Sequence, residues 1–368
     1  MQISVLERIA EVDRGLWDAV VAASGAPVFY TSDFLAAYER WPLQAGLQPF
    51  YLVLRDDRDD RDDRDGRDDR DDREDREGGE GGDGAARPLA VVPAYLQESM
   101  DLVGVLGRAD PAWAAGGQRG LLSHFWHCYD TRLPGASSRA AVAAVCSTLG
   151  TLARQRGAAW YGFINVETGG ELAGHLADLG LTPRPIWNRY ILDLTAFGSA
   201  DDYVDSLPRK QRSEMRRQVR RAGDAGAEIA VREPPFANAA QIAEIAEIAA
   251  LCRRTTAKFG SVPYYPEPAF AELLAAAGRS TRIVTLRLAG ALLGTYVCFT
   301  DHDRFHTWAA GADYQAASFS PYYVCFYEAV RAAIAAGVPL MECGRGNARF
   351  KERYGMQVVP LSALLGRP

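Results

Sequence analysis

The stretch that decides the fold lies near the C-terminal end of the chain, where residues 337–355 read GVPLMECGRGNARFKERYG. Val338–Cys343 is short and mostly apolar, as a buried strand is, and the glycines that follow mark a turn. Asn347–Tyr354 has the length of a short helix, and Gly355 stands where a helix C-cap glycine would. The stretch therefore predicts a strand, a turn and a short helix that carries Lys351.

The order of elements around this stretch occurs twice in the chain. In the second half, an alternating hairpin and a third strand precede a long helix, which Ser320-Pro321 begins and Gly337 ends. In the first half, a helix over residues 138–156 ends at Gly157, and a strand, a short helix and Gly180 follow. The repetition predicts an α/β fold (α+β, with a mixed sheet) in two tandem modules. The predicted modules are residues 1–190 and 191–368, and three further helices are expected over residues 201–222, 239–258 and 268–277.

A low-complexity segment interrupts the first module. Residues 55–84 repeat an Arg-Asp-Asp triplet and then become glycine-rich, with eight arginines and sixteen acidic residues. Because the segment has nothing apolar to bury, we predict a disordered insert in an expanded hairpin loop, and an RNA-binding tract is the alternative. The formal charge of the whole chain is -6, whereas the remainder has 33 basic and 31 acidic residues. Overall acidity therefore does not exclude an anionic partner.

Cysteine and histidine usage gives no sign of a structural metal. The six cysteines are scattered without a C-x-x-C pair, which indicates reduced thiols in a cytoplasmic protein. The pairs His302/His306 and His124/His127 lack a third ligand at a suitable spacing, so no metal site is expected. No window of about 18 apolar residues predicts a membrane span, and the N-terminus does not read as a signal peptide.

A strongly basic helix is predicted at the start of the second module. Residues 209–221 contain seven basic side chains, and Arg209, Arg212, Arg216 and Arg220 share one face, with Lys210 beside them. Such a face can bind the phosphates of a tRNA or of a nucleotide-linked substrate. The alternative is a solvated basic face that pairs with nearby acidic residues.

Three motifs in order resemble the FemAB-like branch of the GNAT acyltransferase superfamily, in which two GNAT-type modules are fused. They are the strand 190–194 with the basic helix after it, the helix start 319–322, and the run 342–355. The resemblance implies transfer of an acyl or aminoacyl group to an amine of a small metabolite or peptide. It also implies a catalytic lysine in the terminal short helix, which falls on Lys351.

The residue types in these motifs fit that chemistry. Acyl transfer passes through a tetrahedral oxyanion, which a cation such as the Lys351 ammonium stabilises. Glu342 or Asp313, each near the end of a strand, would take the proton of the amine, and Tyr314 would protonate the leaving group. The alternative for each residue is an ordinary structural or surface position.

The identity of the acyl donor stays open at this point. Residues 313–320 lack the glycine-rich loop with which GNAT enzymes usually hold coenzyme A, although Ser318 and Ser320 offer additional donors at the helix start. Acyl-CoA and aminoacyl-tRNA both remain candidates, no permanently bound cofactor is expected, and Arg209, Lys210, Arg212 and Arg216 are the predicted phosphate ligands. A non-catalytic nucleic-acid-binding protein on the same scaffold is the alternative function, and the sequence does not determine the oligomeric state.

Overall fold

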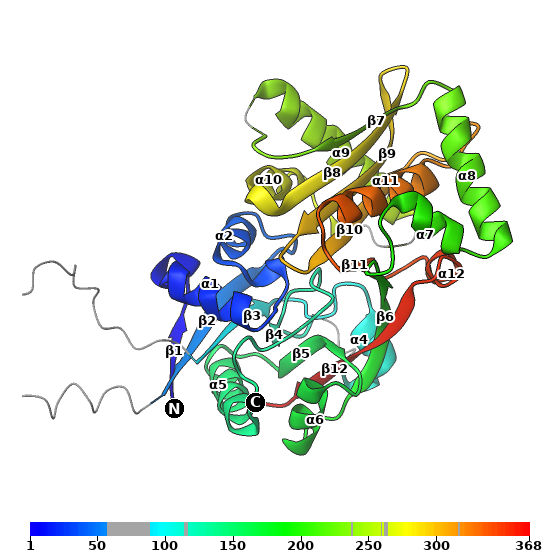
Figure 1. Cartoon of the computed structure of the whole chain (residues 1–368). Coiled ribbons are helices and arrows are strands. Elements are labelled where there is room, and N and C mark those ends of the chain that lie inside the picture. The colour runs from blue at the N-terminus through cyan, green and yellow to red at the C-terminus, as the bar shows by residue number, and fades with distance from the viewer. Residues whose placement is uncertain (57–88, 114–116, 237, 259, 261–263, 316) are drawn as a thin grey trace, which may run out of the picture.

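A continuous mixed sheet runs through the molecule (Figure 1). The computed structural model describes residues 1–56, 89–113, 117–236, 238–258, 260, 264–315 and 317–368. Within them, twelve strands lie in the order β1-β2-β3-β4-β5-β12-β6-β11-β10-β9-β8-β7. The strands are β1 (Gln2–Leu6), β2 (Leu47–Arg55), β3 (Ala90–Gln97), β4 (Gly120–Ser123), β5 (Trp160–Glu167), β6 (Arg184–Asp193), β7 (Glu228–Arg232), β8 (Thr281–Leu288), β9 (Ala291–Thr300), β10 (Arg304–Ala312), β11 (Leu340–Glu342) and β12 (Gln357–Gly366).

The two halves of the sheet repeat one topology, as the sequence predicts. In the first half, the β2–β3 hairpin is followed by β4, a long helix and β5, and β4 pairs with β5 in parallel. In the second half, the β8–β9 hairpin is followed by β10, a long helix and β11, again with a parallel pair. The helices are α1 (Arg14–Ala23), α2 (Ser32–Arg40), α4 (Val105–Ala109), α5 (Arg139–Gln155), α6 (Glu171–Asp178), α7 (Ala200–Ser206), α8 (Arg209–Asp224), α9 (Ala239–Ala257), α10 (Ala269–Ala276), α11 (Pro321–Ala335) and α12 (Ala348–Arg353).

The last strands of the two halves cross over at the centre of the sheet. β12 ends the second half but pairs with β5 of the first, while β6 pairs with both β12 and β11. Figure 1 shows β12 leaving α12 and running into the lower half of the molecule. The predicted boundary between the two modules, at residues 190 and 191, falls inside β6. Because one strand spans this boundary, the division into modules at this point stays a prediction.

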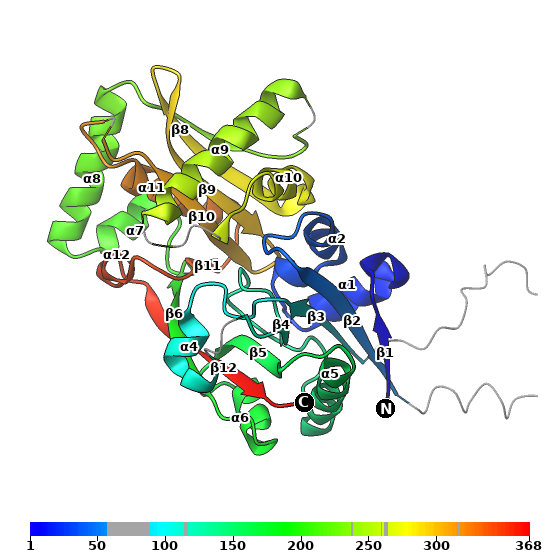
Figure 2. The ribbon, with the colours of Figure 1, turned by 180° about the vertical axis from the view of Figure 1, so that it is seen from behind.

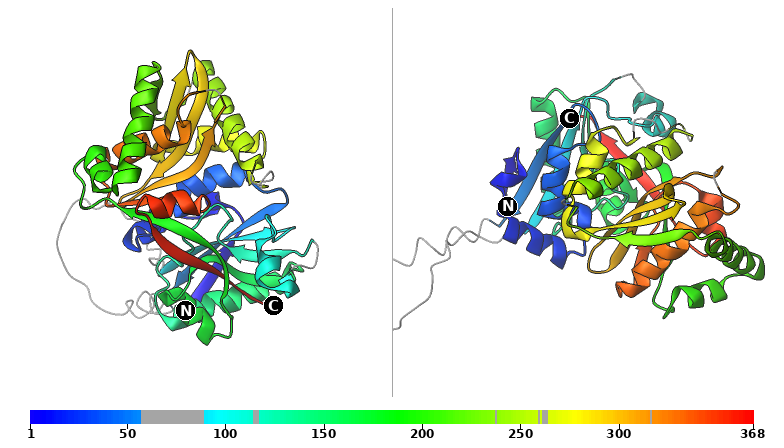
Figure 3. Two further views of the ribbon diagram at one scale, coloured as in Figure 1. Left: turned by 90° about the vertical axis from the view of Figure 1, so that its right-hand side faces the viewer. Right: turned by 90° about the horizontal axis from the view of Figure 1, so that it is seen from above.

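Helices cover both faces of the sheet. On one face, α5 and α6 cover the first half, whereas α7, α8 and α11 cover the second, and each group encloses its own core. On the other face, α1, α2, α9 and α10 enclose a third core that extends across both halves. Figures 2 and 3 show α8 with α11 and α9 with α10 on opposite sides of the second half of the sheet.

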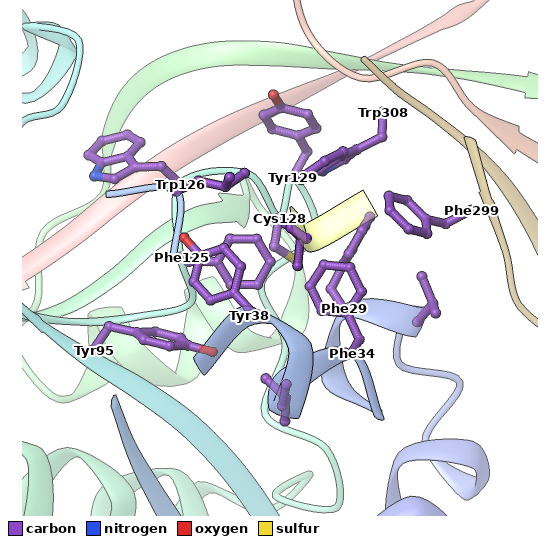
Figure 4. Packing of buried hydrophobic residues seen from close by; sticks show 14 of the residues in the cluster. Phe29, Phe34, Tyr38, Tyr95, Phe125, Trp126, Cys128, Tyr129, Phe299 and Trp308 are labelled. Atoms are coloured by element: carbon purple, nitrogen blue, oxygen red, sulfur yellow. The ribbon is translucent and has the colours of Figure 1, made fainter. Parts of the chain in front are cut away.

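Aromatic side chains from both halves build this shared core (Figure 4). The Phe29 ring packs edge-on against Phe34 at 5.1 Å and against Phe299 at 5.7 Å. Phe299 in turn packs against Trp308 at 5.2 Å. Because such rings bury large apolar areas, the two halves are joined by a common hydrophobic core as well as by the crossed strands.

Two sequence predictions about the connecting segments meet different outcomes. The single helix expected over residues 201–222 is wrong: α7 ends at Ser206, and Leu207 is extended before Pro208. Proline disfavours a helical conformation of the residue before it, which separates α7 from α8. The insert predicted at residues 55–84 lies almost wholly outside the described residues, but its flanks do pair as the β2–β3 hairpin.

Among the described residues, no helix has the length and apolar character needed to cross a bilayer.

Candidate active site

A cavity of about 780 Å³ opens where the second half of the sheet meets the first. Its walls come from β10 and the start of α11, from the turn that follows β11, and from α12. The middle of β6, the end of α9, β9, the first-half residue Tyr129 and the segment just before α10 also line it. Seven tyrosines line the cavity, so its surface combines flat apolar rings with polar hydroxyl groups. Such a mixture suits an organic ligand of moderate size.

Lys351 contributes its ammonium group to this cavity. The short helix α12 starts right after the turn that follows β11, so Lys351 reaches back over the turn. Its Nζ donates hydrogen bonds of 2.9 Å to the carbonyl oxygens of Gly344 and Arg345. The side chain is buried, and burial lowers the pKa of Lys351 to about 8. Its third N–H group makes no hydrogen bond among the described residues, and the Tyr190 ring lies 5.1 Å from Nζ, so this group can donate to a ligand.

Glu342, a predicted base, holds the turn in place. Its Oε2 accepts a hydrogen bond of 2.8 Å from Nη1 of Arg189, and its Oε1 accepts the N–H of Gly344 at 3.1 Å. The same glycine supplies a carbonyl oxygen to Lys351. A chain of contacts thus runs from Arg189 through Glu342 and Gly344 to the ammonium group. The Glu342 carboxylate does not line the cavity.

Arg189 belongs to a buried ionic cluster between the two halves of the molecule. Its Nη2 lies 3.4 Å from Oδ1 of Asp130 and 3.0 Å from Oε2 of Glu167, both from the first half. Arg304 binds Asp130 at 2.5 Å. Burial alone would raise the pKa of Asp130, but the surrounding arginines hold it below its usual range. The cluster therefore stays charged and ties the turn at Gly344 to both halves.

Asp313 and Tyr314, predicted as base and acid, have different positions. Asp313 accepts the N–H of Gln315 at 3.0 Å and does not line the cavity. Tyr314 does line it, with 47 % of the residue exposed, and burial of the rest raises the pKa of its hydroxyl. The fold thus brings Tyr314 and Lys351 to one cavity and leaves Glu342 and Asp313 outside its lining.

The serines predicted to bind a phosphate lie where α11 meets α8. The N–H of Ser320 donates to the side-chain oxygen of Gln218 at 2.6 Å, so α8 already occupies one amide at this helix start. Arg221 donates to the carbonyl oxygen of Ser318 at 3.3 Å. Neither serine lines the cavity.

The four predicted phosphate ligands on α8 divide into two pairs. Arg212 donates to the carbonyl oxygen of Asp205, and Arg216 forms an ion pair with the carboxylate of the same residue. Arg209 and Lys210 are exposed, and no ionic partner among the described residues contacts them. Only this second pair is free to bind an external anion.

Arg345 is a cavity residue that the motif analysis did not assign. Its guanidinium carbon lies 3.9 Å from the centroid of the Trp187 ring and 4.4 Å from that of Tyr264. The sequence shows Arg345 between two glycines, a pattern that usually serves turn geometry. The rings that contact it are distant along the chain, so only the fold brings them together.

The remaining histidines and cysteines have structural surroundings. His124 and His127 bind the carbonyl oxygens of Phe29 and Tyr264, and burial lowers the pKa of each to about 3, so both are neutral. Cys343 lines the cavity, but burial raises the pKa of its thiol to about 12. A thiolate at Cys343 is therefore scarce at neutral pH, which disfavours a covalent route through this residue.

Comparisons with known proteins agree with this geometry. Residues 209–352 match the family model described as an acetyltransferase (GNAT) domain. The fold is similar to that of FemX, with a TM-score of 0.61 and 10 % identity over 98 % of this chain and 97 % of FemX. It is also similar to a tandem GNAT protein from the clavulanic acid biosynthesis pathway, with a TM-score of 0.53 and 13 % identity over 100 % and 98 % of the two chains.

A third similar structure is the C-terminal domain of a putative lysylphosphatidylglycerol synthetase from Agrobacterium fabrum. Its TM-score is 0.50, with 14 % identity over 75 % of this chain and 81 % of that domain. A sequence comparison with curated proteins found no match.

The GNAT domain and the tandem arrangement together define the class of this protein. The chain contains a GNAT-type acyltransferase domain over residues 209–352, and its overall fold is that of proteins with two tandem GNAT-type modules. The alternative of a non-catalytic nucleic-acid-binding protein is therefore set aside.

Proposed function

We propose that this protein is a cytoplasmic N-acyltransferase that moves an acyl or aminoacyl group onto an amine of a small metabolite or peptide. The observation that carries the proposal is the buried Lys351 ammonium, which has one N–H group without a hydrogen bond among the described residues and lines a cavity of about 780 Å³. The cytoplasmic location is supported by six cysteines that are all buried and unpaired.

The reaction follows from these groups. The neutral amine attacks the carbonyl carbon of the donor, and the carbonyl electrons move onto oxygen. The free N–H group of Lys351 donates to that oxyanion. The bond from carbon to the sulfur or oxygen of the carrier then breaks, and the leaving group takes a proton, for which the Tyr314 hydroxyl is the candidate donor. The products are an amide and the protonated carrier.

The proton that the amine loses has no direct acceptor in the cavity wall. Among the described residues, none that lines the cavity is a carboxylate. Glu342 and Asp313 lie behind the lining, so either would receive the proton only through intervening water. An amine that enters in its neutral form has one proton to pass to this water, whereas an ammonium would have two.

The donor is an acyl group on a phosphate-bearing carrier, either coenzyme A or tRNA. The occupied amide of Ser320 weakens the usual place for the coenzyme A pyrophosphate, while the free cations Arg209 and Lys210 favour a large polyanion. Thermal-shift measurements with acetyl-CoA, free coenzyme A and charged tRNA separate the two, because a ligand of the native state raises the Tm. For a tRNA donor, we expect the shift to fall steeply with salt and to shrink in the variant Arg209→Gln/Lys210→Gln.

Replacement of Lys351 tests the catalytic proposal. With the donor so identified and a panel of amines, we expect Lys351→Met to lower kcat by about 10²–10³-fold, or about 3–4 kcal/mol, because one oxyanion donor is lost. The matched control is Arg353→Met, which removes an exposed cation from the same helix. Undiminished transfer by Lys351→Met, with transfer also normal in the control, would remove this lysine from the mechanism.

A further inference from the structure

The charge of the cavity wall is one-sided. Of the described residues that line the cavity, the charged ones are Arg345 and Lys351, and both are cations. Lys351 satisfies two of its N–H groups on backbone carbonyls, as described above. The charge of Arg345 is not balanced by nearby described residues. No carboxylate among them lies within ion-pairing distance of its guanidinium group.

The surroundings of Arg345 fix its plane but leave its charge uncompensated. The Trp187 and Tyr264 rings lie at stacking distance from the guanidinium, and the hydroxyl of Tyr264 is held by Tyr129 at 2.6 Å and donates to the carbonyl of Trp126 at 3.1 Å. Tyrosine hydroxyls are the polar neighbours of the guanidinium. A guanidinium that stacks on rings keeps its N–H groups in one plane, which is the geometry for bidentate binding of an oxyanion.

The position of Arg345 assigns it to the acceptor side of the cavity. The rings around it come from β6, from the first half of the molecule and from the segment before α10. Among the described residues, none from α8, which carries the cations that we assign to the donor, lines the cavity, so the cavity itself is left to the acceptor and the reacting groups. The Lys351 ammonium donates a hydrogen bond to the backbone carbonyl oxygen of Arg345. The proposed reacting centre is therefore next to the residue that carries this guanidinium.

We propose that Arg345 binds an oxyanion, a carboxylate or a phosphate, that the amine acceptor carries next to a flat apolar group. The inference rests on the proposed acyl transfer, since it names the chemistry of the acceptor. The ligand oxyanion supplies the counter-charge that is absent among the described residues around Arg345. A partly buried cation without a counter-ion is unfavourable, and this cost favours an anionic ligand over its neutral analogue.

Three probes of nearly equal shape test the proposal without acyl transfer. Benzoate, phenyl phosphate and benzamide are titrated against the full-length chain, with tryptophan fluorescence as the readout, because Trp187 contacts Arg345. We expect benzoate or phenyl phosphate to bind at least about tenfold more tightly than benzamide, as for one charge-assisted pair. The preferred anion distinguishes a carboxylate acceptor from a phosphorylated one.

Two variants make the test specific to Arg345. Arg345→Gln should remove the preference for the anion, whereas Arg345→Lys should retain part of it, and Arg353→Gln is the exposed control on α12. Equal binding of benzamide and the anions, or an unchanged preference in Arg345→Gln, overturns the proposal. If Arg345→Gln lowers the Tm, the test rests on Arg345→Lys. A lysine cannot bind an oxyanion through two parallel N–H groups, so an unchanged preference for the anion over benzamide in Arg345→Lys would exclude bidentate binding by Arg345.

The outcome is independent of the catalytic proposal. Lys351→Met should keep the preference for the anion while it loses transfer. If this variant retains transfer and the preference is present, the catalytic proposal fails and the anion site stands. If transfer is lost but benzamide binds as well as benzoate, the anion site fails and the catalytic proposal stands.

Discussion

The two halves of the molecule each contain a large cavity at the same place in their topology, yet the two cavities differ in charge. The first, of about 880 Å³, is lined by the loop after β4, the end of β5 and the helix α6. The second is lined by β10, the turn after β11 and α12. Asp130, Glu167 and Glu171 line the first together with Arg132 and His175, whereas the second holds two cations and, among the described residues, no carboxylate.

This difference shows that the fold and the chemistry are separate properties of the duplicated module. Both halves place a short helix after the second parallel strand, but α6 presents Glu171 and His175 to its cavity and α12 presents Lys351. A cavity with carboxylates at its wall repels a developing oxyanion, while the ammonium stabilises it. The comparison therefore favours our proposal that acyl transfer takes place in the second half.

The largest effect is expected at Arg189, which connects the two halves. Arg189→Met leaves Glu342 buried without its cation and weakens the contact to Asp130. Breaking a buried ionic cluster in this way should lower the free energy of unfolding by about 3–5 kcal/mol, measured by urea denaturation. The control is Arg217→Met, at an exposed ion pair with Glu214, for which we expect at most about 1 kcal/mol. Similar losses in both variants would mean that the cluster adds little to stability.

A smaller effect is expected in the pH dependence of the second cavity. Because burial lowers the pKa of Lys351 to about 8, the ammonium loses its proton above that pH. With an acceptor amine that is neutral above about pH 7, kcat should fall roughly tenfold per pH unit beyond pH 8. In Lys351→Arg the guanidinium stays charged, so the rate should be lower but should not decline in this range. Identical profiles for the two proteins would show that another group titrates.

The smallest effect is expected in the first cavity. His175→Ala should change kcat by no more than roughly twofold, since the comparison gives this cavity no part in the chemical step. Its side chain is about one-quarter exposed beside Glu171, so stability should also change little. A loss of activity comparable to that of Lys351→Met would place catalytic groups in both halves.

Much of the fold could be predicted from local sequence, because helix ends and strand periodicity depend on neighbouring residues. Asn238 and Gln241 form a capping box at the start of α9, and Gly337 ends α11 with a positive φ of 70°, as its lack of a side chain permits. The single helix predicted over residues 201–222 is divided into α7 and α8 because Pro208 holds Leu207 in an extended conformation. The crossed pairing of β6 and β12 had no local signal, since strand partners are chosen by long-range packing.

The candidate site could be predicted only in part. The resemblance located Lys351, and its neighbours Gly344 and Arg345 are close in sequence. The environment that gives these residues their properties comes from far along the chain: Arg189 is 153 positions from Glu342, and Trp126 is 138 positions from Tyr264.

The sequence by itself determined the repeated order of strands and helices and the position of one lysine in the last short helix, because these depend on periodicity, on glycine and on proline. The tertiary structure alone decided that this lysine is buried, that Glu342 faces an arginine and that Arg345 stacks on rings with no counter-ion among the residues that the structure describes. The physical reason is that burial and electrostatic environment are set by whichever residues the sheet register brings together, and the register depends on the packing of the whole chain.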